Sequence, residues 1–284
     1  MIHVLSKIST ISFPGLGIGE FQVNSTAISA EKLGFLQKLF GENWDGIAWY
    51  GVIIMVGILL SAGYALWRAK QEGINKDDML DVILVAVIVS VLGARMYYVI
   101  FYGGYDSLYD LIAVWNGGLA IYGAVIGGIL SLILMAKIKK VSAFKLLDIG
   151  AASIILGQAI GRWGNFMNAE AYGYETDLPW RMGIGSGDSA IFVHPTFLYE
   201  SLWNFIGFFL MWYLYKKKKY NGQIFLTYLA WYGFGRMFIE GLRTDSLWLI
   251  PGVIRVSQLV AAVCFAVCTA LLVFFGIKHK KKET

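Results

Sequence analysis

The sequence predicts an all-α polytopic membrane protein of about seven transmembrane helices, with an extracytoplasmic N-terminal arm and a small outer cap between the fourth and fifth spans. Hydrophobic residues make up 57% of the 284 residues and charged residues only 15%, a balance typical of membrane proteins. Seven windows reach the length of about 20 apolar residues that a spanning helix needs. They lie near residues 47–67, 80–101, 118–136, 146–166, 195–215, 223–241 and 253–277.

Every second connection between these windows is rich in Lys and Arg, which predicts how the chain is oriented. The basic ends and connections are expected in the cytoplasm, and they carry Arg68, Lys70 and Lys76; Lys137, Lys139, Lys140 and Lys145; Lys216 to Lys219; and Lys278, Lys280, Lys281 and Lys282. The N-terminus is therefore expected outside and the C-terminus inside. We interpret the formal net charge of +5 as this orientation signal, which favours contact with a lipid bilayer over nucleic acid.

Composition divides the chain into three parts. Residues 1–46 are expected to form an outward-facing N-terminal arm, partly amphipathic, residues 47–277 the seven-helix membrane domain, and residues 278–284 a basic cytoplasmic tail. The outer cap is inserted at about residues 167–194, where several glycines and one proline argue against a helix. We expect no cleavable signal peptide, because the arm lacks a charged segment followed by an apolar one.

Cysteine and histidine indicate no metal site, no cofactor and no enzyme nucleophile. Cys264 and Cys268 stand four residues apart in the last window, where apolar surroundings make a thiol inert. The three histidines, His3, His194 and His279, are scattered along the chain. Motifs that bind zinc or nucleotide phosphate do not occur.

The fourth window ends in a polar stretch that is the first candidate for a functional site. A charge at membrane depth costs about 2.5 to 3.5 kcal/mol, so such groups usually face a protein interior or a wet cavity. Arg162 is such a group, and Gly161 and Gly164 beside it would let a ligand approach closely. The polar surface continues through Asn165, Asn168 and Glu170, and then His194, Tyr199 and Glu200 at the start of the next window.

The sixth window carries a second group of charged residues. Tyr232, Arg236, Glu240 and Arg243 follow at spacings of four, four and three residues, which places them on one helical stripe. Arg236 is expected to pair with Glu240, and Glu240 with Arg243. Such pairs can simply hold the bundle together, and the same holds for Arg95 in the second window. Arginines in several spans also fit an anionic ligand such as a phospholipid headgroup, because the planar guanidinium matches phosphate oxygens.

At this point the residues resemble a known family. Residues 161–173 read GRWGNFMNAEAYG, similar to the pattern G-R-x-G-N-F-x-N-x-E-x-x-G of the prolipoprotein diacylglyceryl transferases. The resemblance spans roughly residues 47–245 and includes IAWYG at 47–51, GAR at 93–95, WNGG at 115–118, HPT at 194–196, LYE at 198–200 and YGFGR at 232–236. It implies transfer of a diacylglyceryl group from phosphatidylglycerol to the lipobox cysteine of a preprolipoprotein. A thioether forms and glycerol phosphate is released.

The resemblance also implies roles for individual residues and a location. It places the protein in a bacterial inner or sole membrane, with seven spans and the N-terminus outside. The catalytic residues expected from it are Arg162, Arg236, Glu170 and Glu240, to which we add Tyr122, where this chain departs from the family pattern. The substrate-binding residues expected are Tyr50, Arg162, Asn165, Asn168, Gly173, His194, Tyr232, Arg236 and Arg243. The two arginines Arg162 and Arg236 are expected to stabilise the departing phosphate.

The group that takes the thiol proton stays open. Glu170 and Glu240 are the two candidates, because burial can raise the pKa of a carboxyl. Some members of the family carry a histidine where this chain has Tyr122, so a histidine base at that position cannot operate here. A phenol with an ordinary pKa near 10 is a poor base at neutral pH, and we interpret Tyr122 as a residue that positions substrate.

Two other classes of protein are compatible with buried arginines. A transporter or flippase for an anionic lipid would show two similar halves with interrupted helices, whereas this sequence has one asymmetric signature. A scaffold with internal ion pairs would not need Gly161, Gly164 and Asn165 around the arginine. The sequence therefore favours an enzyme.

Overall fold

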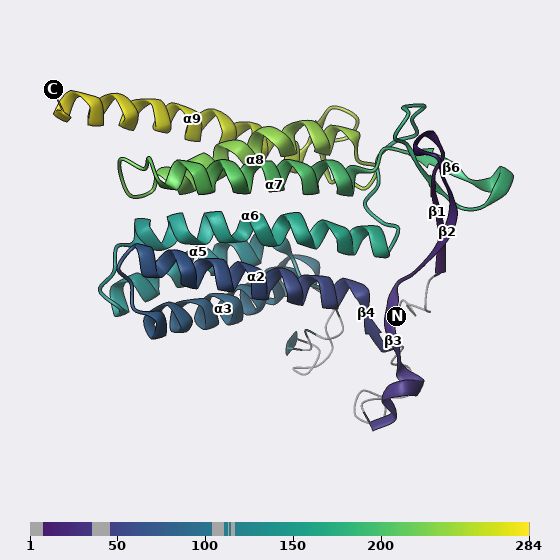
Figure 1. Ribbon diagram of the computed structural model, residues 1–284, viewed down its shortest axis with the longest axis horizontal. Helices are drawn as coiled ribbons and strands as arrows, with labels where there is room; N and C mark the ends of the chain where they lie inside the picture. Colours follow the sequence, from purple (N-terminus) through teal and green to yellow (C-terminus); the bar gives the residue numbers. More distant parts are fainter. Residues whose placement is uncertain (1–7, 36–45, 104–110, 113, 115–116, 284) are drawn as a thin grey trace. The chain divides into compact units, whose positions relative to one another are not determined.

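The computed structural model describes residues 8–35, 46–103, 111–112, 114 and 117–283, and these are mostly helical (Figure 1). The helices are α2 (Trp49–Gln71), α3 (Lys76–Tyr102), α5 (Ile121–Ile138), α6 (Ala143–Met167), α7 (Thr196–Tyr215), α8 (Gln223–Leu242) and α9 (Val256–Glu283). The strands are β1 (Ile8–Phe13), β2 (Ile18–Asn24), β3 (Thr26–Ser29), β4 (Gly46–Ala48), β5 (Met182–Ile184), β6 (Ile191–Val193), β7 (Trp248–Ile250) and β8 (Ile254–Arg255).

Each of the seven predicted windows contains a helix, and five of these helices are long and apolar enough to cross a membrane. The five are α2, α3, α5, α6 and α9. The other two, α7 and α8, have the length but carry charged side chains, among them Glu200 in α7 and Arg236 in α8. The chain is thus a polytopic membrane protein by the length and composition of its helices.

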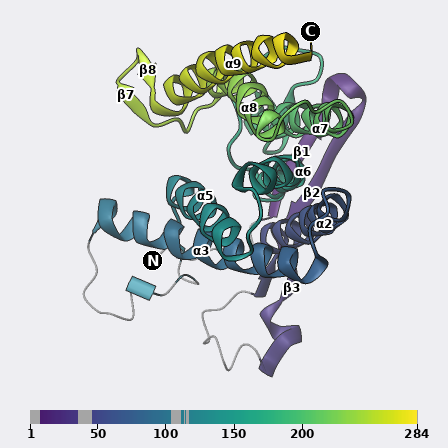
Figure 2. The same cartoon turned by 90° about the vertical axis from the view of Figure 1, so that its left-hand side faces the viewer.

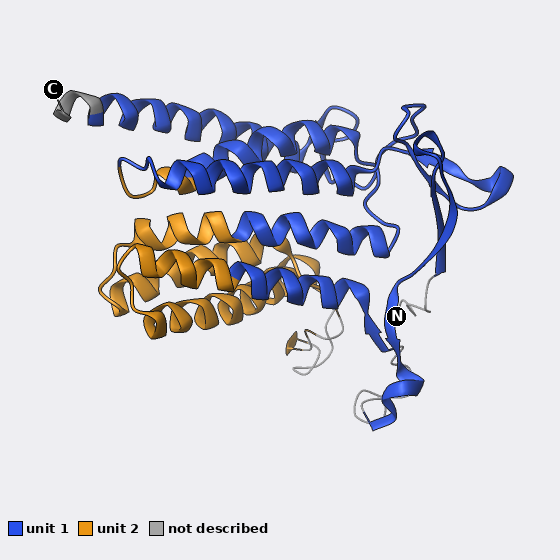
Figure 3. Cartoon of the chain, in the orientation of Figure 1, with its two compact units in different colours: residues 1–61, 154–219, 226–284 blue, residues 62–153, 220–225 orange. Residues whose placement is uncertain are grey.

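The chain forms two compact units (Figure 3). Unit 1 comprises Met1–Ser61, Ile154–Lys219 and Leu226–Thr284, and unit 2 comprises Ala62–Ser153 and Tyr220–Phe225. Helices α2, α6 and α8 each contribute to both units. The candidate arginines of the fourth and sixth windows belong to unit 1, whereas Arg95 and Tyr122 belong to unit 2.

In unit 2, α3 and α5 pack closely because glycines face each other. A Cβ atom added at Gly93 of α3 would lie 2.5 Å from the carbonyl oxygen of Gly123 in α5, too close for any side chain. In the same unit Asp148 of α6 accepts hydrogen bonds from the backbone amides of Gly222 (2.8 Å) and Phe225 (2.9 Å). Asp148 thereby satisfies amides at the N-terminus of α8, where a negative charge is favourable.

In unit 1, helices α7, α8 and α9 lie side by side (Figures 1 and 2). Trp203 of α7 stacks on Trp231 of α8 with ring centroids 4.1 Å apart, and each indole donates to the other's backbone carbonyl at 3.0 Å. Gly233 of α8 packs against the backbone of Ala261 in α9. The hydroxyl of Ser201 in α7 donates to the carbonyl of Ala159 in α6 at 2.8 Å, so α7 contacts both α6 and α8.

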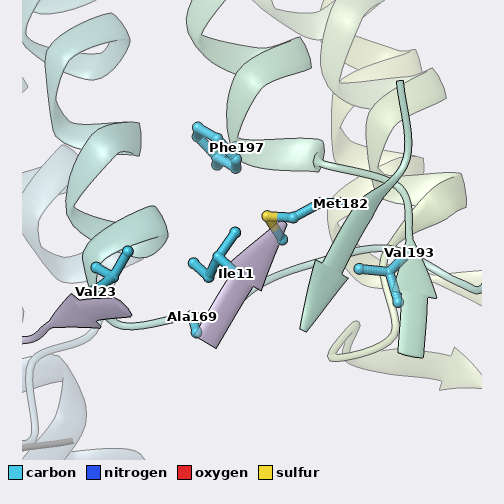
Figure 4. Packing of buried hydrophobic residues seen from close by; sticks show 6 residues of the cluster. All are labelled: Ile11, Val23, Ala169, Met182, Val193 and Phe197. Carbon is cyan, nitrogen blue, oxygen red and sulfur yellow. The ribbon is translucent and has the colours of Figure 1, made fainter. Parts of the chain in front are cut away.

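The N-terminal arm is built of strands, which corrects the all-α prediction. Strands β1 and β2 form an antiparallel hairpin, and the sheet order is β2-β1-β5-β6. The core beside the sheet contains Ile11, Val23, Ala169, Met182, Val193 and Phe197 (Figure 4). The segment ISTISF of β1 is rich in β-branched residues, which favour strands. The arm and the cap thus share a four-stranded sheet. With the two-stranded sheets β3-β4 and β7-β8, the described part of the chain is mostly helical with three small sheets.

Candidate functional site

The glycines of the signature allow the end of α6 to pack closely against the start of α2. A Cβ atom at Gly164 would lie 2.8 Å from the ring of Tyr50, and one at Gly161 would lie 3.2 Å from the side chain of Ile54. We expected these glycines to let a ligand approach closely, and this stays a prediction. They leave room for α2, and Gly164 lets the half-exposed Tyr50 ring pack directly on the backbone of α6.

Arg162 begins a chain of polar contacts that leads out of α6. Its guanidinium contacts the carboxylate of Glu200 and donates to the amide oxygen of Asn165 at 3.3 Å. The amide nitrogen of Asn165 in turn donates to Glu170 at 2.9 Å. Glu170 is exposed, beyond the end of the helix. The three residues therefore lie together, as the signature predicted, with the arginine at the inner end.

Helix α8 supplies the second guanidinium. Arg236 donates to Glu200 at 2.8 Å and pairs with Glu240 at 2.5 Å, and the Arg236–Glu240 pair is the one that the helical spacing predicted. The hydroxyl of Tyr232 lies 3.4 Å from Glu200. Arg162, Tyr232 and Arg236 thus converge on a single carboxylate.

The predicted pair between Glu240 and Arg243 was wrong. Arg243 instead forms a fork with Asp245, through its Nε at 2.9 Å and an Nη at 2.7 Å. The reason is that α8 ends at Leu242, so the helical spacing does not extend to Arg243. Burial alone would raise the pKa of Asp245, but the Arg243 guanidinium outweighs it and holds that pKa below its ordinary value.

Glu200 is the central residue, which the sequence analysis named as part of the polar surface but gave no role. It lies in the first turns of α7 with only 2% of its surface exposed, and each carboxylate oxygen contacts a different arginine. A buried carboxylate between two guanidiniums is stable only because both partners are present. The available signal was an acidic residue inside an apolar window, the same signal that drew attention to Arg162.

The remaining predicted residues of unit 1 lie around the start of α7. His194 faces the hydroxyl of Tyr199 at 3.2 Å, and the Trp180 indole donates to the same hydroxyl at 2.8 Å. Burial lowers the pKa of His194 below its ordinary value, which favours the neutral imidazole. At Gly173 an added Cβ would lie 2.7 Å from the Cβ of His194, so Gly173 lets two backbone segments meet. Asn168 is half-buried, and its backbone amide donates to the carbonyl of Gly164 at 3.2 Å.

Arg255 is a second residue that the sequence analysis missed. It is buried, contacts the backbone carbonyl of Glu240 and donates to the hydroxyl of Tyr174 at 3.1 Å. Its guanidinium also lies 4.8 Å from the Trp248 ring, within the range of a cation–π contact. Arg255 therefore joins the end of α8 to the segment after α6 through neutral partners.

Unit 2 contains the other two residues of interest. Arg95 is buried and donates to the carbonyl oxygens of Leu111 (3.0 Å), Gly117 (2.7 Å) and Gly118 (3.1 Å). Tyr122 is half-buried at the start of α5, with its ring 6.1 Å from that of Tyr97. Trp115 and Asn116 of the WNGG stretch lie outside the described residues, as does His3. The role expected for Tyr122 stays a prediction.

The polar centre of unit 1 has the chemistry of an anion site. Two arginines on different helices point at one position, with a phenol and two buried carboxylates around them. No group of three metal-ligating His, Cys, Asp or Glu side chains occurs among the described residues. The fold and this centre define a class: a polytopic membrane protein with an arginine-lined polar site between its helices.

Comparison with known proteins gives the family. The sequence model of the prolipoprotein diacylglyceryl transferase family matches residues 43–274. Three similar proteins are named phosphatidylglycerol–prolipoprotein diacylglyceryl transferase. That of Bacillus licheniformis is 43% identical over 83% of this chain and 90% of its own, that of Finegoldia magna 46% over 83% and 92%, and that of Bacillus cereus strain G9842 47% over 76% and 83%. The chain belongs to the prolipoprotein diacylglyceryl transferase family.

Proposed function

We propose that this chain transfers the diacylglyceryl group of phosphatidylglycerol to the lipobox cysteine of preprolipoproteins, the first step of bacterial lipoprotein maturation. The single observation that carries the proposal is the convergence of Arg162 and Arg236 on one position between membrane helices. Guanidiniums bind phosphate oxygens through paired N–H donors, and a phospholipid is the anion that a membrane-embedded site meets. The names of the relatives support the same reaction.

The reaction exchanges one bond for another at the glyceryl carbon. The thiol loses its proton, the sulfur bonds to carbon, and the carbon–oxygen bond to phosphate breaks with its electron pair on oxygen. Arg162 and Arg236 stabilise the negative charge that develops on the departing glycerol phosphate. Such electrostatic stabilisation of the transition state is strongest in a site with little water. The other residues that we expect to bind substrate are Tyr50, Asn165, Asn168, Gly173, His194, Tyr232 and Arg243.

Access to the substrate, and not the burial considered above, makes Glu170 the better of the two candidates for the proton acceptor. Glu240 is 2% exposed and is engaged by Arg236, so it is neither accessible nor free of a cation. Glu170 is exposed, and its carboxylate accepts a hydrogen bond from the neutral amide of Asn165. A substrate thiol can therefore reach Glu170 without the breaking of an ion pair.

We further propose seven spans, with α7 and α8 crossing the membrane beside the five more apolar helices. The basic connections then lie in the cytoplasm, and the arm and the cap lie outside. Reporter fusions at residue 284 and at the N-terminus test the orientation. A cytoplasmic signal from the N-terminal fusion would contradict it.

The reaction is tested with purified protein, phosphatidylglycerol and a synthetic lipobox peptide, analysed by mass spectrometry. We expect a diacylglyceryl mass gain on the cysteine and release of glycerol phosphate. Matched controls replace the peptide cysteine with serine and phosphatidylglycerol with phosphatidylcholine, and both should remain unmodified. Folded protein that gives no gain on the cysteine would rule the proposal out, whereas lipid movement between vesicles without a product would favour a transporter.

A further inference from the structure

Glu200 occupies the position at which an anion would be bound. Its two carboxylate oxygens contact Arg162 of α6 and Arg236 of α8, the latter at 2.8 Å. Its side chain is 3% exposed, against 22% for Arg162 and 15% for Arg236. A carboxylate and a phosphodiester each carry one negative charge over two oxygens, and both accept the same paired N–H donors. Glu200 therefore uses donors that a lipid phosphate needs.

The charges of this cluster balance without any ligand. Arg162 and Arg236 contribute two positive charges, and Glu200 and Glu240 contribute two negative ones. An anionic lipid that bound beside Glu200 would add an unbalanced negative charge in a poorly hydrated region, which is costly. The phosphate and the Glu200 carboxylate must therefore compete for the two guanidiniums.

Asn204 offers a second partner for Glu200 one turn further along α7. It is fully buried, and neither atom of its amide has a hydrogen-bond partner among the described residues. Native structures rarely leave such atoms unpaired, because each costs about 1 to 3 kcal/mol. Residues four apart lie on the same helical face, and the side chain of Asn204 tilts toward the turn of Glu200.

The neighbours of α7 confirm which way this face points. Glu200 contacts Arg162 of α6 and Arg236 of α8, and further along α7 a Cβ atom at Gly207 would lie 2.4 Å from the Trp231 indole of α8 and 2.6 Å from the side chain of Ile155 in α6. Asn204 lies between Glu200 and Gly207 on the same stripe, so it faces the same two helices, α6 and α8. A carboxylate that leaves the arginines can swing toward Asn204 without crossing to another face.

We propose that Glu200 is a resident counter-ion that yields Arg162 and Arg236 to the phosphate of an anionic lipid and then accepts a hydrogen bond from Asn204, so that this pair of residues sets the affinity for the lipid. The inference rests on the proposed function for the identity of the lipid. It predicts opposite effects for the two residues, which neither a purely structural role nor a simple substrate contact would produce.

The first test is Glu200→Gln, which keeps the shape of the side chain and removes its charge. Binding of phosphatidylglycerol in detergent micelles diluted with phosphatidylcholine should become about tenfold tighter, because the competing carboxylate is gone. The matched control, Glu175→Gln, removes an exposed carboxylate of the cap and should leave the affinity unchanged. Unchanged or weaker binding in Glu200→Gln would overturn the proposal.

Loss of Glu200 also leaves two partly buried guanidiniums without their shared partner, so the thermal midpoint is measured with each lipid. Phosphatidylglycerol should restore the midpoint of Glu200→Gln, since it supplies the missing anion, and phosphatidylcholine should not. If Glu200→Gln does not fold, Glu200→Asp keeps the charge but is too short to span both arginines, and it should bind phosphatidylglycerol more tightly as well. The proposal is contradicted if phosphatidylglycerol does not raise the thermal midpoint of Glu200→Gln and Glu200→Asp binds this lipid more weakly than the unaltered protein.

The second test is Asn204→Leu, which keeps the volume and removes the amide. Phosphatidylglycerol should bind this variant about tenfold more weakly, because the displaced carboxylate loses its partner. In the Glu200→Gln background the same substitution should change the affinity little, which a double-mutant cycle measures. Equal effects in both backgrounds would mean that Asn204 acts independently of Glu200. These binding measurements omit the peptide, so failure of the transfer reaction and failure of this proposal are separate results.

Discussion

Arg95 in unit 2 and Arg162 in unit 1 are both arginines of apolar helices, but their partners differ in kind. Arg95 is 6% exposed, and its donors meet three backbone carbonyls of the connection between α3 and α5. Arg162 contacts a carboxylate and a side-chain amide. Backbone carbonyls are fixed parts of the fold, whereas a carboxylate carries a charge that another anion can replace. The kind of hydrogen-bond partner, more than the burial of the guanidinium, distinguishes a structural arginine from one that can bind a ligand.

The largest effect that this comparison predicts is for Arg162→Lys. The ammonium keeps the charge but loses the planar fork, so turnover of phosphatidylglycerol and lipobox peptide should fall by about 100-fold or more. Membrane insertion and the thermal midpoint should be nearly unchanged, as measured by fractionation and a melting curve. Turnover within a few-fold of the unaltered protein would show that Arg162 only joins α6 to α7.

Arg95→Lys should give the reverse result. One ammonium cannot reach all three carbonyls, and hydrogen bonds of charged donors are worth about 1.5 to 3 kcal/mol. We expect the thermal midpoint to fall by roughly 5 °C, with turnover per folded molecule close to normal. A large loss of turnover at an unchanged midpoint would remove the distinction between the two arginines.

A smaller effect is expected for Tyr122→Phe. If the hydroxyl only positions substrate, the loss corresponds to one hydrogen bond, about 0.5 to 1.5 kcal/mol, and the pH–rate profile keeps its shape. If the phenol takes the thiol proton, the rate should fall by ~10² or more and the alkaline limb of the profile should disappear. The second result would make Tyr122, and not Glu170, the proton acceptor.

The smallest effect is expected for the double change Cys264→Ala and Cys268→Ala. Both cysteines are free thiols of α9, and Cys268 is buried. Turnover and expression should match those of the unaltered protein. Loss of turnover in a normally folded variant would revive a mechanism with an enzyme thiol, which nothing else in the described part of the chain supports.

The parts of the site that could be predicted lie on single helices. The Arg236–Glu240 pair follows from a spacing of four residues, and Arg162, Asn165 and Glu170 lie within nine residues of one another. Glu200 was missed as the centre because its partners are on two other helices, and no local spacing reports that. The prediction of a Glu240–Arg243 pair was wrong because α8 ends at Leu242, one residue before the helical spacing reaches Arg243.

The same division holds for the fold. Long apolar windows predict helices well, because a helix satisfies its own backbone hydrogen bonds. The strands of the arm were not predicted, since β1 pairs with β2 beside it but also with β5 far along the chain. The pairing of β1 with β5 depends on where the cap residues lie in space. The short sequence of β1 does not contain that information.

The central place of β1 has a consequence for the order of events during synthesis. Its partner β5 follows roughly 170 residues later, and ribosomes add about 5 to 20 residues per second. On the order of 10 to 30 seconds therefore pass in which the hairpin of β1 and β2 exists alone, and an isolated hairpin is marginally stable at best. A helper that shields Ile11 and Val23 during this interval would raise the yield of folded protein without touching the finished molecule.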